Sequence, residues 1–390
     1  MLDASRPVYM DYHATTPVDE RVVRAMLPYF TDVFANAASV DHEAGAQANA
    51  AVEAARDHVA RLLGARSDEI VFTSGATEAD NLAILGATEK LADKGNHVIT
   101  TVAEHKAVLD ACKHLERLGK RVTYLPVDAY GRVNLDELRE AITNETVLIS
   151  IMAANNEIGT VAPLAEIGAI ARERGVLFHT DATQAVGYID IDVVKQHIDL
   201  LSLSAHKFYG PKGVGALYVR KRGKRVRLAP QLHGGGHERG MRSGTLNVPG
   251  IVGLGAAADI ARKEREALAA RLRHLRDRLW HALQAAVPGV ELNGHPTERL
   301  PHNLSVFIPG VESRSLLVQT KRDVALSTGS ACTTASVEPS HVLLALGFGE
   351  NRAHQSVRFG LGRGTTEAEV DFVAARVADA AARLRQLVAS

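Results

Sequence analysis

Short apolar runs alternate with helix-like segments over residues 67–217, and this alternation restricts the fold more than any other feature of the sequence. The clearest strand-like runs cover residues 98–102, 121–125, 146–152 and 176–179. Repeated strand–helix units predict a mostly parallel sheet, because a parallel neighbour is reached only through a crossover connection. We therefore expect an α/β fold whose ligand-binding residues gather at the carboxyl ends of the strands.

A second pattern begins after Pro249. Strand-like runs at 303–308 and 356–360 and a helical pattern at 366–387 indicate a smaller α+β unit. Before them, leucines recur at steps of three or four residues, which predicts one long amphipathic helix. These leucines are Leu268, Leu272, Leu275, Leu279 and Leu283.

Composition limits the classes of function. The 390 residues carry 45 basic and 45 acidic side chains, which argues against nucleic acid or an acidic membrane as the main partner. No apolar stretch approaches the roughly 20 residues that cross a bilayer, and residues 1–7 lack a basic-then-apolar export signal. We expect a cytoplasmic protein without a membrane partner.

One lysine stands where an alternating apolar run meets a glycine-flanked turn. The run 201–206 delivers Ser204 and His206, and Lys207 follows directly. A lysine in such a turn suits imine formation with a bound aldehyde, which suggests pyridoxal phosphate. Lys212, in the same loop, lacks the preceding strand and fits a surface lysine better.

Partners for the other parts of that cofactor follow other strands. An apolar run ends in Asp181, where a carboxylate can pair with the ring nitrogen and keep it protonated; a helix N-cap is the alternative reading of Asp181. A strand at 70–73 breaks at Gly75 and leads into a helix at 79–85. The free N–H groups and positive end of that helix suit a phosphate dianion.

The sequence contains two cysteines, too few for a disulfide framework. Cys112 shares a helical face with Val108 and Leu115, so we expect a small core residue. Cys332 lies in a run of small polar residues, which predicts a mobile loop at about 325–337. A thiol with a pKa near 8.5 is only a few per cent thiolate at neutral pH, so a reactive cysteine needs help from its surroundings or its substrate.

Together these motifs resemble the cysteine desulfurases of the class-V aminotransferase superfamily, close to the housekeeping iron–sulfur assembly branch. The motifs occupy residues 11–17, 73–78, 104–109, 155–159, 181–184, 204–207, 239–245 and 330–333, so the resemblance covers nearly the whole chain. It implies a pyridoxal-phosphate enzyme of fold type I with a mostly parallel, seven-stranded sheet. We assign the large domain to residues 15–262 and a small domain, which carries the cysteine loop, to residues 1–14 and 263–390.

The resemblance also implies a set of cofactor contacts. Gln184 would contact the phenolic oxygen, His105 would stack on the ring, and Thr245 would reach the phosphate of a neighbouring subunit, which implies a homodimer. The full cofactor-binding set is Ala76, Thr77, His105, Asn156, Asp181, Gln184, Ser204, His206, Lys207 and Thr245.

By the same resemblance the catalytic residues are Cys332, Lys207 and His105. Lys207 would hold the cofactor and move the Cα proton of the substrate, L-cysteine. Arg358, helped by Asn156, would bind the substrate carboxylate. Cys332 would attack the substrate sulfur and keep it as a persulfide, with L-alanine as the product. We expect no metal site, because the glycines between His233 and His237 do not hold two imidazoles on one face.

Two other functions stay open. A related lyase acting on selenocysteine or cysteine sulfinate would need Cys332 less, and a non-catalytic sulfur-relay scaffold would need no cofactor chemistry. Iron–sulfur scaffold and sulfur-acceptor proteins are the expected protein partners. The sequence ends at Ser390 without the longer tail that housekeeping members use for scaffold binding, so we expect that contact to be lost or to use a shorter surface.

A basic run at 220–227 is the one marked concentration of charge. Its simplest interpretation is a solvated β-hairpin. The resemblance adds a second interpretation, in which the corresponding surface receives acidic accessory proteins.

Overall fold

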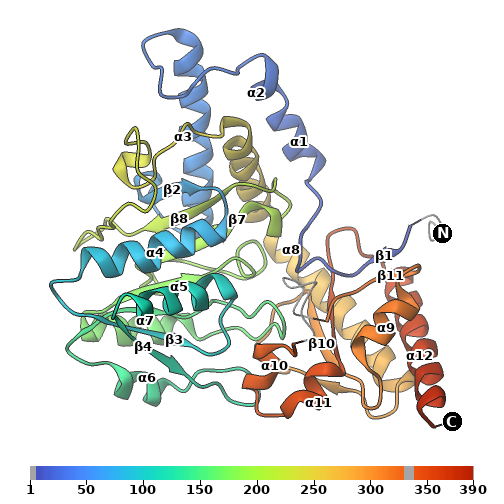
Figure 1. Ribbon diagram of the computed structural model, residues 1–390. Helices are drawn as coiled ribbons and strands as arrows, with labels where there is room; N and C mark the ends of the chain where they lie inside the picture. Colours follow the sequence, from blue (N-terminus) through green and yellow to red (C-terminus); the bar gives the residue numbers. More distant parts are fainter. Residues whose placement is uncertain (1–5, 329–337, 390) are drawn as a thin grey trace.

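The computed structural model describes residues 6–328 and 338–389. Its main sheet has seven strands in the order β2-β8-β7-β6-β5-β3-β4 (Figure 1). β8 is antiparallel to both neighbours, and the other pairs are parallel, so the predicted α/β fold with a mostly parallel seven-stranded sheet is confirmed. The strands are β2 (Ile70–Thr73), β3 (His97–Thr101), β4 (Arg121–Leu125), β5 (Thr146–Ser150), β6 (Leu177–Asp181), β7 (Leu200–Ser204) and β8 (Gly215–Val219).

Helices cover both faces of this sheet. On one face α4 (Ala76–Lys90) and α5 (Lys106–Arg117) pack over Leu148 and Leu200, and Cys112 is buried there as predicted. On the other face α3 (Glu43–Leu63), α7 (Leu164–Arg174) and the start of α8 (Val248–Ala286) pack over Ile149 and Leu201. Neighbouring strand residues point to opposite faces, so a sheet that is covered twice needs continuous apolar runs. The remaining large-sheet helix is α6 (Leu135–Ala141).

A second core forms around a small antiparallel sheet and the far half of α8. In this sheet β10 (Asn303–Phe307) lies between β12 (Ser356–Gly360) and β9 (Glu291–Leu292). α12 (Glu367–Ala389) packs beside α8, and the strands β1 (Val8–Tyr9) and β11 (Val324–Ala325) pair in parallel. The long helix predicted from the leucine repeat is confirmed. The domain boundaries at residues 14/15 and 262/263 stay a prediction.

Five short helices complete the described α-helices: α1 (Glu20–Met26), α2 (Pro28–Thr31), α9 (Ser313–Thr320), α10 (His341–Ala345) and α11 (Gly349–His354). Across residues 6–328 and 338–389, none of the helices is both long enough and apolar enough to cross a membrane.

The basic run does not form the expected β-hairpin. The chain leaves β8 and continues through residues 220–227 without a strand. The Arg220 guanidinium donates to the carbonyl oxygens of Arg222 (2.7 Å) and Lys224 and pairs with Asp199. These contacts use backbone carbonyls that a hairpin ladder would otherwise need, so the segment becomes a loop folded around one side chain.

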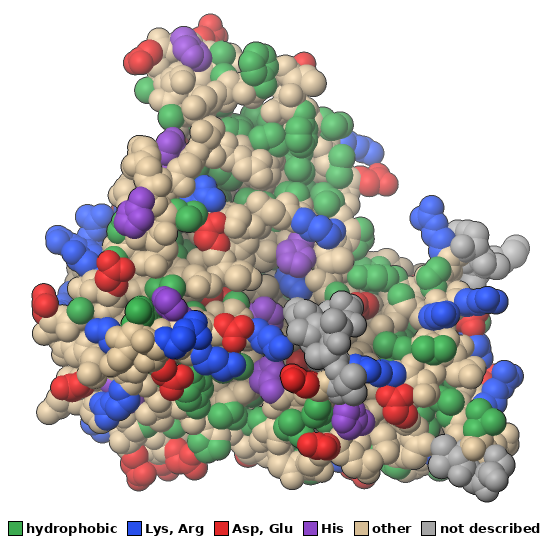
Figure 2. Space-filling model, in the orientation of Figure 1, with side chains coloured by type: hydrophobic (Ala, Val, Ile, Leu, Met, Phe, Trp, Pro, Cys, Tyr) green, Lys and Arg blue, Asp and Glu red, His purple; other side chains and the backbone are tan. Residues whose placement is uncertain are grey.

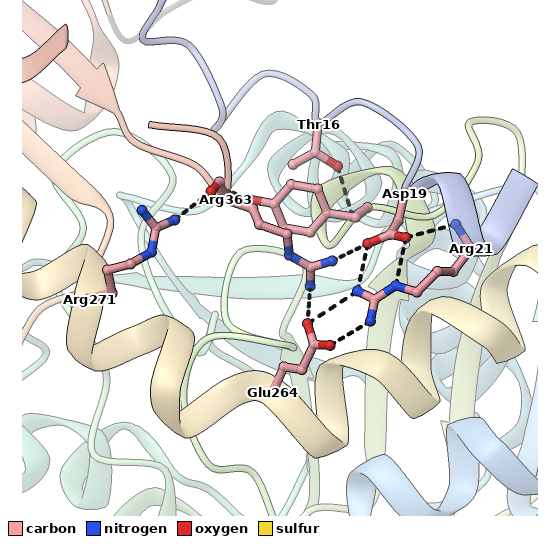
Figure 3. Close-up of polar contacts among 7 residues, drawn as sticks. Thr16, Asp19, Arg21, Glu264, Arg271 and Arg363 are labelled. Atoms are coloured by element: carbon pink, nitrogen blue, oxygen red, sulfur yellow. Dashed lines mark hydrogen bonds and ion pairs between the residues drawn. The ribbon is translucent and has the colours of Figure 1, made fainter. Parts of the chain in front are cut away.

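An ion-pair network joins the N-terminal segment, α8 and the loop after β12 (Figure 3). Arg21 binds Asp19 at 2.9 Å and Glu264 at 2.6 Å, and Arg363 pairs with the same two carboxylates. Hydrogen bonds from Arg21, with a further contribution from Arg363, lower the pKa of Asp19 to about 2.

The same network reaches the predicted lysine turn. The backbone N–H of Arg363 donates to the Tyr209 hydroxyl at 2.6 Å, and the Tyr209 N–H donates to the Thr16 hydroxyl at 2.8 Å. Because Tyr209 follows Lys207 by two residues, the network connects the lysine turn to the second core.

We predict that Arg363→Ala lowers the free energy of unfolding by about 1–3 kcal/mol, because it leaves two half-buried carboxylates with one cation between them. Chemical denaturation followed by circular dichroism measures the effect. Arg273→Ala, an exposed position on α8, is the control and should change stability by less than about 0.5 kcal/mol. Equal losses in the two variants would contradict a structural role for the network.

Candidate active site

Lys207 lies directly after β7, at the end of a short 3-10 turn (Ala205–Lys207). Its Nζ donates to the carbonyl oxygen of His13 at 2.5 Å and to that of Ala14 at 2.9 Å. The turn is also tied to the N-terminal segment through Thr16, whose N–H and hydroxyl both donate to the His206 carbonyl at 2.9 Å. The lysine amine is therefore held at the carboxyl edge of the sheet.

Asp181 and Gln184 lie at the end of the adjacent strand, β6, and both are buried. Asp181 accepts a hydrogen bond from the Thr183 N–H at 2.9 Å. Gln184 donates its amide to the His13 carbonyl at 3.0 Å, and its Oε1 lies 2.9 Å from His13 Nδ1. Because Oε1 can only accept, Nδ1 is the donor in this pair.

His13 is thus a site residue to which the sequence analysis gave no role. Its ring is buried and stacks on His302, with centroids 4.4 Å apart. Burial, reinforced by the nearby charges of Arg358 and Lys207, holds the pKa of His13 well below its usual range, so the ring is neutral. The only sequence signal was its position inside the 11–17 motif.

A small cradle lies between the Gly75 turn and the end of β7. A Cβ on Gly75 would lie 3.8 Å from the Ser204 hydroxyl, and a Cβ on Gly215 would come within 2.8 Å of the Gly75 backbone. Space therefore requires glycine only at position 215, where it lets the turn approach β8, whereas Gly75 is favoured by its φ of +155°. The N–H groups of Ala76 and Thr77 belong to the first turn of α4, where the helix itself offers no acceptor.

His206 lies in the turn after β7, in contact with the N-terminal segment of the chain. Its Nδ1 is 3.1 Å from the Thr15 hydroxyl. Burial, with the charges of Lys207 and Lys212, lowers the pKa of His206 to about 4. At neutral pH the ring is uncharged and can donate one hydrogen bond to an anion without carrying a charge itself.

Two buried groups beneath Asp181 also escaped the sequence analysis. His179 lies two residues before Asp181 on β6, and its nitrogens are 2.8 Å from the Ser150 hydroxyl and 3.0 Å from the Ser202 hydroxyl. Asp80 of α4 lies 3.6 Å from the same ring. Burial lowers the pKa of His179 to about 4, whereas burial and the charge of Asp181 raise the pKa of Asp80 well above its ordinary value. The sequence contains one signal for His179: residues 179 and 181 are two apart on one strand, so their side chains point to the same face of the sheet.

Glu104 is a third buried acid, at the carboxyl end of β3. Its Oε1 accepts from the Met152 N–H at 2.9 Å and from the Thr101 hydroxyl at 3.1 Å. Its Oε2 has no hydrogen-bond partner among the described residues, and Glu104 is one of the residues that line a cavity of about 30 Å³. Burial, with the charge of Asp181, raises the pKa of Glu104 to about 8. The next residue, His105, caps α5 by accepting the Ala107 N–H at 3.2 Å, which fixes the histidine at this strand end.

Arg358 reaches the same region from β12 and is buried. Its guanidinium donates to the Asn156 carbonyl at 2.8 Å and to Asp11 at 2.9 Å. Asn156 adds a buried Oδ1 that has no hydrogen-bond partner among the described residues. The structure therefore brings together the two residues predicted to bind a carboxylate.

Two predicted site residues are not placed with the others. Cys332 lies outside the described residues. Ser327, two residues before the undescribed residues 329–337, accepts the Arg358 N–H on its carbonyl oxygen at 2.8 Å. Thr245 is exposed, and the hydrogen bonds of the described residues do not join it to Lys207. Its predicted role concerns a neighbouring subunit, so this arrangement does not test it.

The donors at this edge of the sheet fit an aromatic aldehyde that carries a phosphate. Lys207 offers an amine, and Asp181 a buried carboxylate for a ring nitrogen. The first turn of α4, with Ser204 beside Gly75, offers donors to a dianion. Arg358 adds a guanidinium for a carboxylate, so the arrangement suits a cofactor and an amino acid together.

We predict that Glu104→Gln becomes more stabilising relative to wild type as pH rises from about 5 to about 8, by about 1 kcal/mol or more. Over this range the folded wild type keeps a proton on Glu104 that the unfolded chain has lost, so wild-type stability falls with pH and the amide variant escapes that loss. Denaturant melts at both pH values measure the difference. The exposed Glu140→Gln is the control, and a pH-independent difference for Glu104→Gln would contradict a buried, protonated acid.

Residues 8–373 match the aminotransferase class-V family. A cysteine desulfurase IscS from Anaeromyxobacter sp. (strain Fw109-5) is 56% identical over 381 residues, covering 98% of this chain and 94% of the relative. Among solved structures, a NifS-like protein superposes with a TM-score of 0.89 at 38% identity, over 96% of this chain and 98% of that one. The structure described as SspA in complex with cysteine gives a TM-score of 0.80 at 40% identity, over 91% and 98%. The chain therefore belongs to the class-V aminotransferase family and, within it, to the cysteine desulfurases.

Proposed function

We propose that this chain is a pyridoxal-phosphate-dependent L-cysteine desulfurase that converts L-cysteine to L-alanine and keeps the sulfur as a persulfide on Cys332. The observation that carries the proposal is the meeting of Lys207, Asp181 and Gln184 at adjacent strand ends, with Arg358 entering from β12. Relatives that are named cysteine desulfurases, and a similar structure that is described with cysteine, support the choice of substrate.

When bound, pyridoxal phosphate supplies an electron sink that stabilises negative charge on the substrate carbon next to the amino group. The buried Asp181 would pair with its ring nitrogen, and Gln184 would face its phenolic oxygen. The phosphate would be held by Ala76, Thr77, Ser204 and His206 of this chain and Thr245 of a second copy.

The substrate is oriented by residues from both cores. Arg358 binds the carboxylate through its guanidinium, and Asn156 adds its side-chain amide. Asp11 already holds one guanidinium nitrogen, so the arginine is positioned before the substrate arrives. Lys207 then removes the proton from the substrate Cα. The imidazole of His105, which is fixed after β3 and would stack on the cofactor ring, can accept and release a proton beside that ring.

Sulfur transfer uses the second nucleophile. The Cys332 thiolate attacks the substrate sulfur, an S–S bond forms, and the C–S bond breaks with its electron pair left on the substrate carbon. That carbon takes up a proton, so sulfur is exchanged for hydrogen and L-alanine leaves. The persulfide on Cys332 is then available to an acceptor.

We predict that Cys332→Ala lowers L-alanine formation from L-cysteine by about 100-fold or more, while the absorption of the bound cofactor is retained. Mass spectrometry of the wild type after incubation with L-cysteine should find one added sulfur on Cys332. Cys112→Ala is the matched control, because burial raises the pKa of the Cys112 thiol to about 12 and leaves it unreactive. Retained alanine formation by Cys332→Ala would contradict the mechanism and favour a selenocysteine or cysteine-sulfinate lyase. A purified chain that binds no pyridoxal phosphate would instead favour the relay scaffold.

We propose further that the active protein is a homodimer. Large apolar side chains of the N-terminal region are exposed: Val23, Leu27, Phe30, Phe34 and Val40, with Phe34 reaching 76% exposure. Figure 2 shows hydrophobic side chains gathered over α1 and α2. Such a patch on a monomer favours burial against a partner, and a second copy would also bring the exposed Thr245 to its predicted place.

We predict that Leu27→Asp with Phe34→Asp shifts the protein from dimer to monomer in sedimentation velocity, because it places two charges in the apolar patch. Leu118→Asp with Val318→Asp is the matched control, since these side chains are also more than half exposed and lie outside the patch. A dimer that persists in the first variant would place the interface elsewhere.

Iron–sulfur scaffold proteins, other sulfur acceptors and acidic accessory proteins remain the proposed partners, and the cytoplasm the proposed location. These assignments follow from the family to which the chain belongs.

A further inference from the structure

A cavity of about 920 Å³ lies at the amino edge of the large sheet, away from the strand ends that carry Lys207 and Asp181. The starts of β5 and β6, the residues before β7 and the end of the antiparallel β8 line it, together with the last turns of α4 and α7. None of the described residues of the candidate active site borders it. Its volume falls within the range of about 300–1,000 Å³ that is typical of small-molecule sites.

The rim of this cavity is strongly cationic. Six exposed basic side chains line it without an ion pair or a carboxylate hydrogen bond among the described residues: Lys90, Lys94, Arg174, Lys224, Arg225 and Arg227. Asp199 is the only lining carboxylate in the described part of the chain, and Arg220 already pairs with it. The whole chain has no net charge, so this excess of positive charge is a local feature.

Helix dipoles explain only part of this charge. Lys90 and Arg174 lie at the carboxyl ends of α4 and α7, where cations offset the negative end of a helix. Lys94, Lys224, Arg225 and Arg227 lie outside any helix. Keeping these like charges around one cavity has an electrostatic cost that a bound anion would remove.

The floor of the cavity is apolar. Its accessible apolar surface comes from the partly exposed Leu91, Ile142 and Leu177, and the buried Val147, Ile198, Tyr218 and Val226 also line it. Val194, which is 44% exposed, adds an apolar side chain at the edge. An inorganic anion would use the rim and leave this floor in contact with water, whereas a ligand with an anionic end and a flat apolar end would use both.

We propose that this cavity binds an organic phosphate of nucleotide size, with its phosphates at the cationic rim and its flat ring on the apolar floor. The site is separate from the desulfurase centre, and it does not rest on the proposed reaction.

The test uses the holoenzyme saturated with pyridoxal phosphate, so that the phosphate cradle of the active site is filled. Fluorescence anisotropy measures binding of N-methylanthraniloyl-ADP to wild type and to Lys94→Glu with Arg225→Glu. We expect at least about tenfold weaker binding in this variant, because two of the six rim cations are reversed. Arg273→Glu with Arg383→Glu makes the same change in net charge at exposed positions on α8 and α12 and should stay within about twofold of wild type.

A second variant separates ring binding from charge attraction. Val194→Asn should weaken binding of the fluorescent nucleotide about threefold and leave competition by inorganic pyrophosphate unchanged. No saturable binding up to about 1 mM would overturn the proposal. So would equal losses in the two charge-reversed variants, or pyrophosphate binding as tightly as ADP. Desulfurase turnover should be unchanged in all three variants, so failure here is distinguishable from failure of the proposed reaction.

Discussion

The hydrogen bonds from the Lys207 amine to the carbonyl oxygens of His13 and Ala14 are the contact on which the rest of the site depends. These hydrogen bonds hold the N-terminal segment against the end of β7. The same segment includes His13, whose imidazole ring orients the Gln184 side chain. Before this segment the chain forms β1, and after it comes Asp19 with its ion pairs. The lysine is therefore positioned by both cores, although its own turn belongs to the large sheet.

Burial controls the charges around this lysine. Burial and the charge of Asp181 favour the protonated forms of the neighbouring Asp80 and Glu104. The pKa of Asp80 is raised well above its ordinary value and that of Glu104 to about 8, so Glu104 holds a proton at neutral pH. His179 is neutral for the same reason of burial. The ring nitrogen of a bound cofactor would thus face the Asp181 carboxylate beside neighbouring acids whose protonated forms burial favours.

The two edges of the sheet differ in the kind of ligand they suit. At the carboxyl edge, buried polar groups and the first turn of α4 surround a compact site. At the amino edge, exposed cations surround an apolar floor with almost no acid among its described lining residues. Parallel strands produce this separation, because they send all their βα turns to one edge and all their αβ turns to the other.

Several features followed from local pattern and were confirmed. Several strands of the large sheet are continuous apolar runs, α8 carries a leucine periodicity, and Cys112 lies on an apolar helical face that the structure buries. The hairpin expected at 220–227 was wrong, because a single guanidinium satisfies the carbonyls that strand pairing would have used. Local pattern cannot report where a long side chain turns back on its own loop.

The order of residues was enough to predict the α/β architecture and the family, both of which were confirmed, because periodicity and ordered motifs are local properties of the chain. It also predicted Lys207 as the lysine that holds the cofactor, and that assignment stays a prediction. Only the folded chain decided that His13, Asp80, Glu104 and His179 surround the same strand ends, and that six cations share one cavity. Those relations join segments up to 171 positions apart, as His13 and Gln184 show, and both burial and proton affinity depend on which residues such segments bring together.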